Sequence, residues 1–421
     1  MKSENRMLVE TLIRKGVQIE NPEGVQVDRN VDPLRISGEG VVIHTGCKIF
    51  GRSTLILQGT ELGKEGPVTI ENCQLGPNVQ LKSGYFKDAV FLEKAGAGYG
   101  SRIREGTILE EEASVSHAVD LKQTILFPFV TLGSLINFCD CLMAGGTSRR
   151  DHSEVGSSFI HFNFTPNQDK ATPSLIGDVS RGVMLNQRSI FLGGQGGIVG
   201  PCRLEFGTVS AAGTICRKDQ LKPDRLIYER GGPGGNIPHY PGMYRSVKRI
   251  VHNNLIYIAN LMALMQWYRH VRCRFVSNAF PEALLNGLKE KLQMNIDERI
   301  NRLEVFSRKM PDSLRIYQET LKEDASSMLI LQKKEIHDNW TDLKEALNTL
   351  LDYAGDERLR DRFLERITSG IQSADKDYLA VIKGLNPQES EIGTHWLQGI
   401  VDHVVGRALK IIPSFGGTKQ I

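Results

Sequence analysis

One short stretch holds side chains whose type and spacing could do chemistry. In TSRRDHSEVG (147–156), Arg149 and Arg150 stand just before His152. Two neighbouring guanidinium groups can grip a phosphate or a carboxylate in bidentate fashion. A histidine, with a pKa of about 6.5, suits the task of a general base near neutral pH. We take His152 as the first candidate base and both arginines as candidate anion ligands. The alternative is that these residues have no chemical role, because the arginines form a solvated corner and His152 is a surface histidine.

A second group stands at the lip of a polar loop. The segment SFIHFNFTPNQDKATPSLIGD (158–178) begins and ends like a strand, and two prolines lie between. Because proline cannot continue a sheet ladder, we expect residues 164–174 to form a loop that projects from the regular structure. Such a loop creates a pocket on an otherwise flat face. His161, close to Asn163, is the second candidate base, and the alternative is a strand histidine that faces solvent.

The elements that position these groups follow a period of six residues. This period suits short strands joined by tight corners, three to a coil, with the aliphatic side chain pointing into the coil. Each coil exposes an apolar end, so stacking is needed to close the core. Residues 36–217 leave room for about nine or ten coils. A β-sandwich is the alternative, but its strands should alternate apolar and polar residues. The period is clearest at Ile43, Ile49, Leu55; Leu109, Val115, Leu121, Phe127; and Leu192, Ile198, Leu204.

The second half of the chain reads differently. Of the 42 glycines, 33 lie before residue 246, whereas all three tryptophans lie after it. Apolar residues three and four apart, in PEALLNGLKEKL (281–292) and DERINRLEVFSRKM (297–310), predict an α-helical domain of about five or six helices. Gly/Pro-rich ERGGPGGNIPHYPGMY cannot sustain a helix or a central strand. We therefore expect a β-solenoid, a left-handed parallel β-helix, followed by an α-helical domain, with these boundaries: lead-in 1–35, β-helix 36–228 with the loop 164–174, linker 229–244, helical domain 245–421.

Composition narrows the function classes. A formal net charge of +3, with no basic block, argues against nucleic-acid binding. The seven cysteines show no metal-ligand spacing, so we expect reduced thiols, a cytoplasmic protein and no metal. The charged start of the chain predicts no signal peptide. The most apolar run, 255–268, is shorter than the ~20 residues that a bilayer needs, and we expect a buried helix rather than a membrane-surface segment. Tight corners explain the glycine run 191–201 better than a phosphate loop does.

At this point the sequence resembles a known family. The hexads resemble the left-handed β-helix of the hexapeptide-repeat transferases, most closely the acetyltransferase half of the bifunctional N-acetylglucosamine-1-phosphate uridyltransferases. That family carries I-G-A-G-T-I-T-C-N-Y-D-G, a short basic loop and then I-I-G-D. Here VGSSFIHFNFTP (155–166), the loop and LIGD (175–178) follow the same order. GTVSAAGTICRKD (207–219) resembles the family's closing coil, G-A-T-I-A-A-G-T-T-V-T-R. The likeness spans roughly residues 35–220.

The resemblance implies an acyl- or acetyltransferase that acts on a sugar or sugar nucleotide, with acetyl-CoA as donor. It implies a homotrimer whose active sites lie in grooves between neighbouring β-helices. Asn163 matches an asparagine that helps to hold acetyl-CoA, and Phe164 replaces the adjacent tyrosine. Ala211 and Ala212 match a small pair whose backbone contacts the cofactor.

The family's substrate-binding and catalytic residues match less closely. Lys170 stands near the loop lysine that meets the nucleotide-sugar phosphates. His152 lies where the family has its catalytic G-H-L histidine, although fewer residues separate it from the loop. In NFCDCLMAGG (137–146), Leu142 stands at a family lysine that contacts the sugar nucleotide, and FPFVTLG (127–133) lacks a family arginine.

The uridyltransferase half has no counterpart here. Its G-x-G-T-R-M loop is missing, so we expect no nucleotidyl transfer by this chain. Two hypotheses remain open: a transferase, or a non-catalytic nucleotide-sugar-binding or scaffolding trimer that uses its helical domain for partners.

Overall fold

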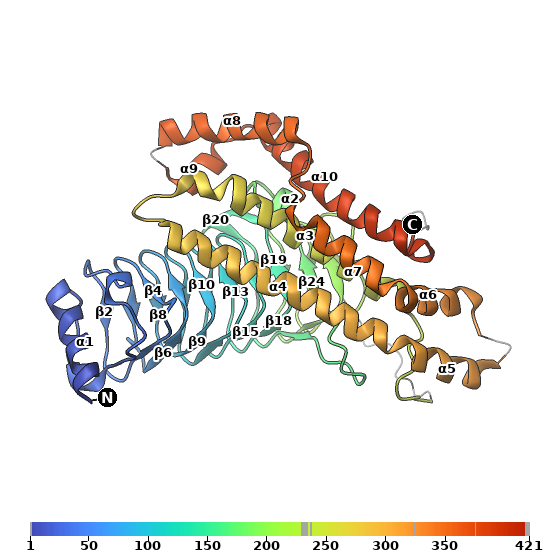
Figure 1. Cartoon of the computed structure of the whole chain (residues 1–421), viewed down its shortest axis with the longest axis horizontal. Coiled ribbons are helices and arrows are strands. Elements are labelled where there is room, and N and C mark those ends of the chain that lie inside the picture. The colour runs from blue at the N-terminus through green and yellow to red at the C-terminus, as the bar shows by residue number, and fades with distance from the viewer. Residues whose placement is uncertain (1, 229–234, 236–237, 323–324, 375, 417–421) are drawn as a thin grey trace.

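Short strands and tight corners wind the first half of the chain into a parallel spiral with three faces (Figure 1). The computed structural model describes residues 2–228, 235, 238–322, 325–374 and 376–416. The strands of the three faces form three sheets, here named A, B and C, whose strands are given below. Successive strands pass from sheet B to sheet C to sheet A and back, which is the parallel β-helix that the hexads predict. The three edges of the spiral are named B/C, C/A and A/B after the sheets that they join.

The strands of each sheet are short and pair in parallel register. Sheet A consists of β2 (Val42–Ile43), β5 (Glu61–Leu62), β8 (Gln80–Leu81), β11 (Gly96–Ala97), β14 (Ser114–Val115), β17 (Thr131–Leu132), β22 (Glu154–Val155), β25 (Phe191–Leu192), β28 (Val209–Ser210) and β30 (Leu226–Ile227). Sheet B consists of β1 (Gln26–Val27), β3 (Lys48–Phe50), β6 (Val68–Glu71), β9 (Gly84–Lys87), β12 (Ser101–Ile103), β15 (Asp120–Lys122), β18 (Asn137–Cys139), β23 (Ile160–Phe162), β26 (Gly197–Val199) and β29 (Ile215–Cys216). Sheet C consists of β4 (Leu55–Ile56), β7 (Gln74–Leu75), β10 (Ala89–Phe91), β13 (Thr107–Leu109), β16 (Ile125–Leu126), β19 (Cys141–Met143), β24 (Ser174–Ile176) and β27 (Cys202–Leu204). An antiparallel hairpin, β20 (Gly146–Ser148) and β21 (Asp151–His152), projects from the C/A edge.

The spiral begins earlier than the hexads suggested. Strand β1 pairs with β3, and Gln18 bridges to Val42, so the segment expected as a lead-in already belongs to the sheets. This is why the described spiral has about eleven turns instead of nine or ten. Helix α1 (Lys2–Lys15) buries Val9 and Leu12 against the first coil and so covers its apolar end. Of the predicted linker, residues 229–234 and 236–237 lie outside the described part of the chain.

The second half is helical, as predicted. Residues 281–292 and 297–310, expected as separate helices, lie largely on one 27-residue helix, α4, because nothing between them interrupts the pattern. In the described residues, the α-helices after the spiral are α3 (Lys248–His270), α4 (Glu282–Arg308), α5 (Met310–Leu321), α6 (Ser327–Asp338), α7 (Trp340–Thr349), α8 (Glu357–Ala374), α9 (Tyr378–Lys383) and α10 (Pro387–Ile411). The short helices elsewhere are α2 (Val179–Gly182) and the 3₁₀ turns η1 (Pro22–Gly24), η2 (Pro33–Arg35), η3 (Arg272–Phe275), η5 (Leu350–Asp352) and η6 (Pro413–Phe415).

Helices α3 and α4 lie across one face of the spiral, sheet C (Figure 1). From β10 to β24 the outward side chains of this sheet are apolar and buried, whereas those of sheets A and B are mostly polar or partly exposed. Burial of these apolar groups is the main force that attaches the helical region, at about 25 cal/mol per Å². The covered stripe, one residue per coil, is Val90, Ile108, Ile125, Leu142 and Leu175.

Helix α4 follows the B/C edge and contacts successive coils with every fourth residue. Lys291 pairs with Asp88 at 3.5 Å, and Asn295 donates to the carbonyl of Gly106 at 2.6 Å. Arg299 then pairs with Asp140 at 2.7 Å. Four helical residues rise about 6 Å and neighbouring strands lie about 4.8 Å apart, so the two repeats stay in step over several coils. The corner residues that meet the helix have left-handed backbone conformations: Asp88, Gly106, Gln123 and Asp140.

Candidate functional site

The loop between β23 and β24 projects from the B/C edge, as predicted, but its tip rests on the helical region of its own chain. Lys309 donates to the carbonyl of Asn167 at 2.6 Å. The amide of Asn254 donates to the carbonyl of Ala171 at 3.0 Å. Asp169, which is buried, accepts hydrogen bonds from Thr165, from the backbone of Ala171 and from the hydroxyl of Tyr244. The loop is therefore held in place by contacts within the chain.

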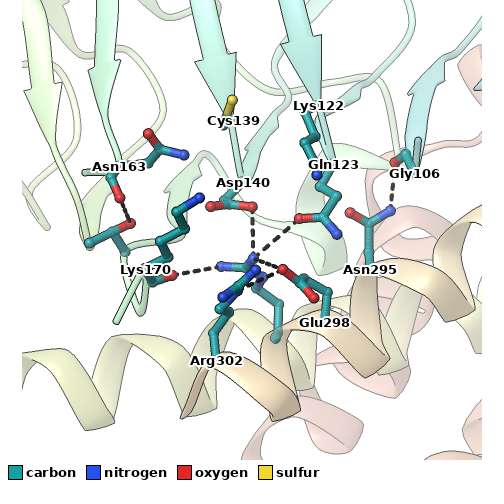
Figure 2. Close-up of polar contacts among 12 residues, drawn as sticks. Gly106, Lys122, Gln123, Cys139, Asp140, Asn163, Lys170, Asn295, Glu298 and Arg302 are labelled. Carbon is teal, nitrogen blue, oxygen red and sulfur yellow. Dashed lines mark hydrogen bonds and ion pairs between the residues drawn. The ribbon is translucent and has the colours of Figure 1, made fainter. Parts of the chain in front are cut away.

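Arg299 is the centre of a polar cluster where this loop meets the edge. Figure 2 shows its partners Gln123, Asp140 and Lys170 around this point. Its guanidinium donates to Asp140 at 2.7 Å, to the amide oxygen of Gln123 at 3.3 Å and to the carbonyl of Lys170 at 3.3 Å. Arg299 and Asp140 are both buried, so their opposite charges compensate each other away from water. Sequence reasoning missed this cluster, because 159 residues separate the two charges.

The structure brings three of the predicted residues to this edge. Asn163 begins the loop, and its carbonyl accepts a hydrogen bond from Thr172 at 3.1 Å (Figure 2). Phe164 is 68% exposed, and the side chain of Lys170 is also exposed. The exposed ring of Phe164 and the exposed ammonium group of Lys170 therefore lie in the loop beside the Arg299 cluster, and the half-buried Asn163 begins that loop.

His161 lies inside the spiral, between neighbouring coils. It continues an interior ladder with Phe138 and Ile198, and its Nε2 lies 2.8 Å from Oγ of Ser174. Burial lowers the pKa of His161 to about 4, so the ring is neutral at pH 7. It is thus not the solvent-facing strand histidine that the sequence left as the alternative.

The β20–β21 hairpin places His152 on a different edge, C/A. Its Nε2 lies 3.8 Å from a carboxylate oxygen of Glu154, and its buried Nδ1 has no hydrogen-bond partner among the described residues. Arg149 bends back over the edge and donates to the carbonyls of Glu112 and Phe129. Arg150 is exposed at the tip of the turn. His152 therefore keeps one ring nitrogen free, whereas much of the donor capacity of Arg149 is used within the protein.

Ala211 and Ala212 lie on the third edge, A/B. A Cβ atom on Gly193, in the neighbouring coil, would come within 2.5 Å of the backbone of both alanines. Close packing of corners therefore explains the glycine run 191–201, as expected. The three groups of candidate residues occupy three different edges of one chain.

Leu142, the residue at the position of a family lysine, lies on sheet C beneath the helices. Its side chain is fully buried in the covered stripe. A lysine there would put a charge under the helical layer, so the leucine follows from the way the two halves pack.

In the described residues, we find no cluster of histidine, cysteine and carboxylate side chains that could hold a metal ion. Nor does any helix there have the length and apolarity needed to cross a membrane.

Comparison with known proteins supports the fold-level interpretation. No protein-family model matches the chain. Bifunctional protein GlmU of Thermotoga petrophila is 26% identical over 212 residues, which is 50% of this chain and 42% of that protein. Bifunctional protein GlmU of Pelobacter propionicus is 26% identical over 215 residues (51% and 41%), and that of Nocardia farcinica is 25% identical over 241 residues (57% and 43%). The chain spans about two fifths of the length of these curated relatives. It is a left-handed β-helix of the hexapeptide-repeat type that is similar over about half its length to bifunctional GlmU proteins.

Proposed function

We propose that this protein is an acyltransferase that moves an acetyl group from acetyl-CoA to a sugar or sugar nucleotide, in grooves between the chains of a homotrimer. The observation that carries the proposal is the arrangement of faces and edges. The chain covers sheet C with its own helices and leaves the apolar groups on the last coils of sheets A and B exposed.

Sheets A and B are the faces that suit contacts with other copies. On sheet A, Phe191 pairs in register with Val209 and Val209 with Leu226, and all three side chains are 38–62% exposed. On sheet B, Ile160 and Phe162 are 42% and 39% exposed. Neighbouring exposed apolar groups of this kind are typical of protein interfaces. A heterologous contact between sheet A of one chain and sheet B of the next closes into a ring.

In such a ring, the A/B edges point to the axis. The outer lips of each contact are then the C/A edge of one chain and the B/C edge of its neighbour. The first edge carries His152, and the second carries Asn163 and Lys170. Strands β22 to β24 form one continuous coil between hairpin and loop, so the two edges present these residues at nearly the same height. Groups that are apart in one chain thus meet across a groove.

The chemistry then follows from the residue types. The acceptor amine attacks the thioester carbonyl, the carbon–sulfur bond breaks, and the thiolate leaves. His152 takes the amine proton and returns it to the thiolate. Arg150 and Lys170 bind the anionic groups of the sugar nucleotide, with Arg149 beside them. Asn163, Phe164, Ala211 and Ala212 hold the cofactor, with the inner pair nearer the axis.

One alternative has specific support. Leu142 stands at the position of a family lysine, and Arg149 donates to the edge, so one phosphate-binding charge is missing and another is engaged within the protein. A trimer that binds nucleotide sugars without turnover, and uses its helical region for partners, would show this loss. In both hypotheses we propose that this chain carries out no nucleotidyl transfer.

The test is a thermal-shift titration of the full chain with acetyl-CoA, coenzyme A and nucleotide sugars. The stabilisation follows the logarithm of ligand concentration over Kd. We expect acetyl-CoA to raise Tm, the His152→Ala variant to keep this shift, and thiol release in the presence of an amino sugar to disappear in that variant. Binding without thiol release in the parent protein would support the non-catalytic alternative. No shift with any of these ligands would refute both.

A further inference from the structure

A pocket that uses none of the candidate transferase residues lies between the last coils and the helical region. Its volume is about 450 Å³, within the range of small-molecule sites. It opens between β24, α2 and β27 on one side and α3 and α10 on the other. Its apolar lining comes from Leu175, Leu204, Leu221, Ile256, Val401, Val405 and Leu409.

Helix α10 forms an apolar wall of the pocket, and one position in that wall, Gly406, has no side chain. Val401, Val405 and Leu409 lie on one face of the helix at a spacing of four, and Gly406 lies on the same side. A glycine inside a helix costs about 0.5–1 kcal/mol relative to alanine. A Cβ atom on Gly406 would meet nothing within 4 Å, so packing does not demand the glycine. Gly406 is exposed, and without a side chain it leaves the outer end of the pocket open.

The polar end of the pocket has unused hydrogen-bonding capacity. Arg203 Nε and His252 Nδ1 are buried, and neither has a hydrogen-bond partner among the described residues. The nearest carboxylate, Asp219, lies 3.8 Å from Arg203 Nε. Its oxygens already accept from Asn253 at 3.0 and 3.1 Å. Arg203 is 19% exposed and its ion pair with Asp219 is long, so its guanidinium favours a closer anionic ligand.

The other charged side chains that line the pocket already have partners within the protein. Asp178 and Glu205 both pair with Arg181. Asp402 is exposed on α10, where it accepts from Gln398 at 2.8 Å. Burial, together with the charges of Arg203 and Lys248, lowers the pKa of His252. The inner end is therefore short of negative charge.

We propose that this pocket binds an aliphatic carboxylate. The head group pairs with the partly exposed guanidinium of Arg203, beside His252, and the chain lies along Ile256, Val405 and Leu409. This site does not rest on the transferase function, since it lies under α3 and α10 and uses none of the residues assigned there.

The experiment is calorimetric titration of the full chain with four probes: decanoate, decanol, decylamine and butyrate. Decanoate supplies chain and anion, and each of the others lacks one of these features. We expect decanoate to bind and the other three to bind at least about tenfold more weakly, because charge-assisted hydrogen bonds and apolar burial are both needed. Equal binding of decanol or decylamine, or no binding of decanoate, would overturn the proposal.

A matched pair of variants locates the site. Gly406→Leu fills the pocket from α10 without meeting other atoms. Gly399→Leu makes the same change on the same helix, also with nothing within 4 Å, at a position that does not line the pocket. We expect Gly406→Leu to abolish decanoate binding and Gly399→Leu to leave it unchanged. Arg203→Met should weaken it about tenfold or more. Decanoate binding that survives Gly406→Leu would place the ligand elsewhere.

Discussion

Replacing Arg299 by alanine tests how the helical region is fixed to the spiral. Arg299 is 1% exposed, and its guanidinium is bonded to Asp140, to Gln123 and to the carbonyl of Lys170. Removing it leaves the Asp140 carboxylate, 4% exposed, without its counter-charge. Breaking a buried ion pair from one side costs about 3–5 kcal/mol. The same change frees the end of the 164–174 loop.

Arg302→Ala is the matched control, three residues along the same helix. Arg302 pairs with Glu298 at 2.7 Å on the partly exposed face of α4. Such i,i+4 pairs contribute about 0.3–0.5 kcal/mol. The two variants therefore differ by a factor of roughly ten in expected cost, although both remove one arginine.

The assay is urea unfolding at neutral pH, combined with hydrogen exchange of the α4 amides. Exchange reports local detachment even where the whole chain does not unfold in two states. We expect Arg299→Ala to lower the unfolding midpoint and to accelerate exchange along α4. We expect the double variant Arg299→Met with Asp140→Asn to recover part of the loss, because it removes both charges. The reasoning is refuted if Arg299→Ala and Arg302→Ala unfold within about 0.5 kcal/mol of each other.

Three further changes test other parts of the structure. Burial and the neighbouring Glu111 raise the pKa of Glu110 from 4.5 to about 7. The folded state therefore holds this proton more tightly, and stability is lost as pH rises from 4.5 through 7. Glu110→Gln should remove this loss, which is about 3 kcal/mol at pH 8, and urea unfolding measured at pH 5 and pH 8 checks it. Leu142→Lys should destabilise by several kcal/mol because it buries a charge under α3 and α4, whereas Leu331→Lys, at a 49% exposed position of α6, should change the urea midpoint little. Equal effects would contradict the covered face. Tyr244→Phe removes the hydroxyl that donates to buried Asp169. It should lower the free energy of unfolding by about 1–2 kcal/mol and speed proteolysis within residues 164–174. Unchanged cleavage would show that the loop does not depend on this bond.

Parts of the fold are predictable because their signals are periodic. The six-residue beat indicates the spiral, and the glycine and tryptophan distribution indicates where it ends. The phase of that beat could also have placed His161 inside, since it occupies the interior position that Phe138 and Ile198 fill in neighbouring coils. The interpretation of the sequence judged His161 by its residue type and did not use its position in the six-residue period.

The sequence does contain a signal for the covered face of the spiral. Comparing single residues with the family obscured it. Ile108, Ile125 and Leu142 are apolar at outward positions, where a solvated sheet would carry polar groups. Leu142 looked like a lost ligand, but it is one member of a stripe beneath the helices. The pairing of Arg299 with Asp140, and the division of the site residues among three edges, depend on three-dimensional packing that no local pattern encodes.

Subunit complementation tests the central claim, a catalytic groove shared by two chains. His152→Ala and Lys170→Ala should each be inactive alone, with acetyl-CoA and an amino sugar as substrates and thiol release as the readout. Co-expressed in equal amounts, they should assemble at random into trimers in which about a quarter of all contacts combine an intact His152 with an intact Lys170 from the next chain. We therefore expect about a quarter of the parent activity to return in the whole preparation, and about a third in the trimers that contain both variants. Mixed trimers as inactive as the single variants would contradict the account.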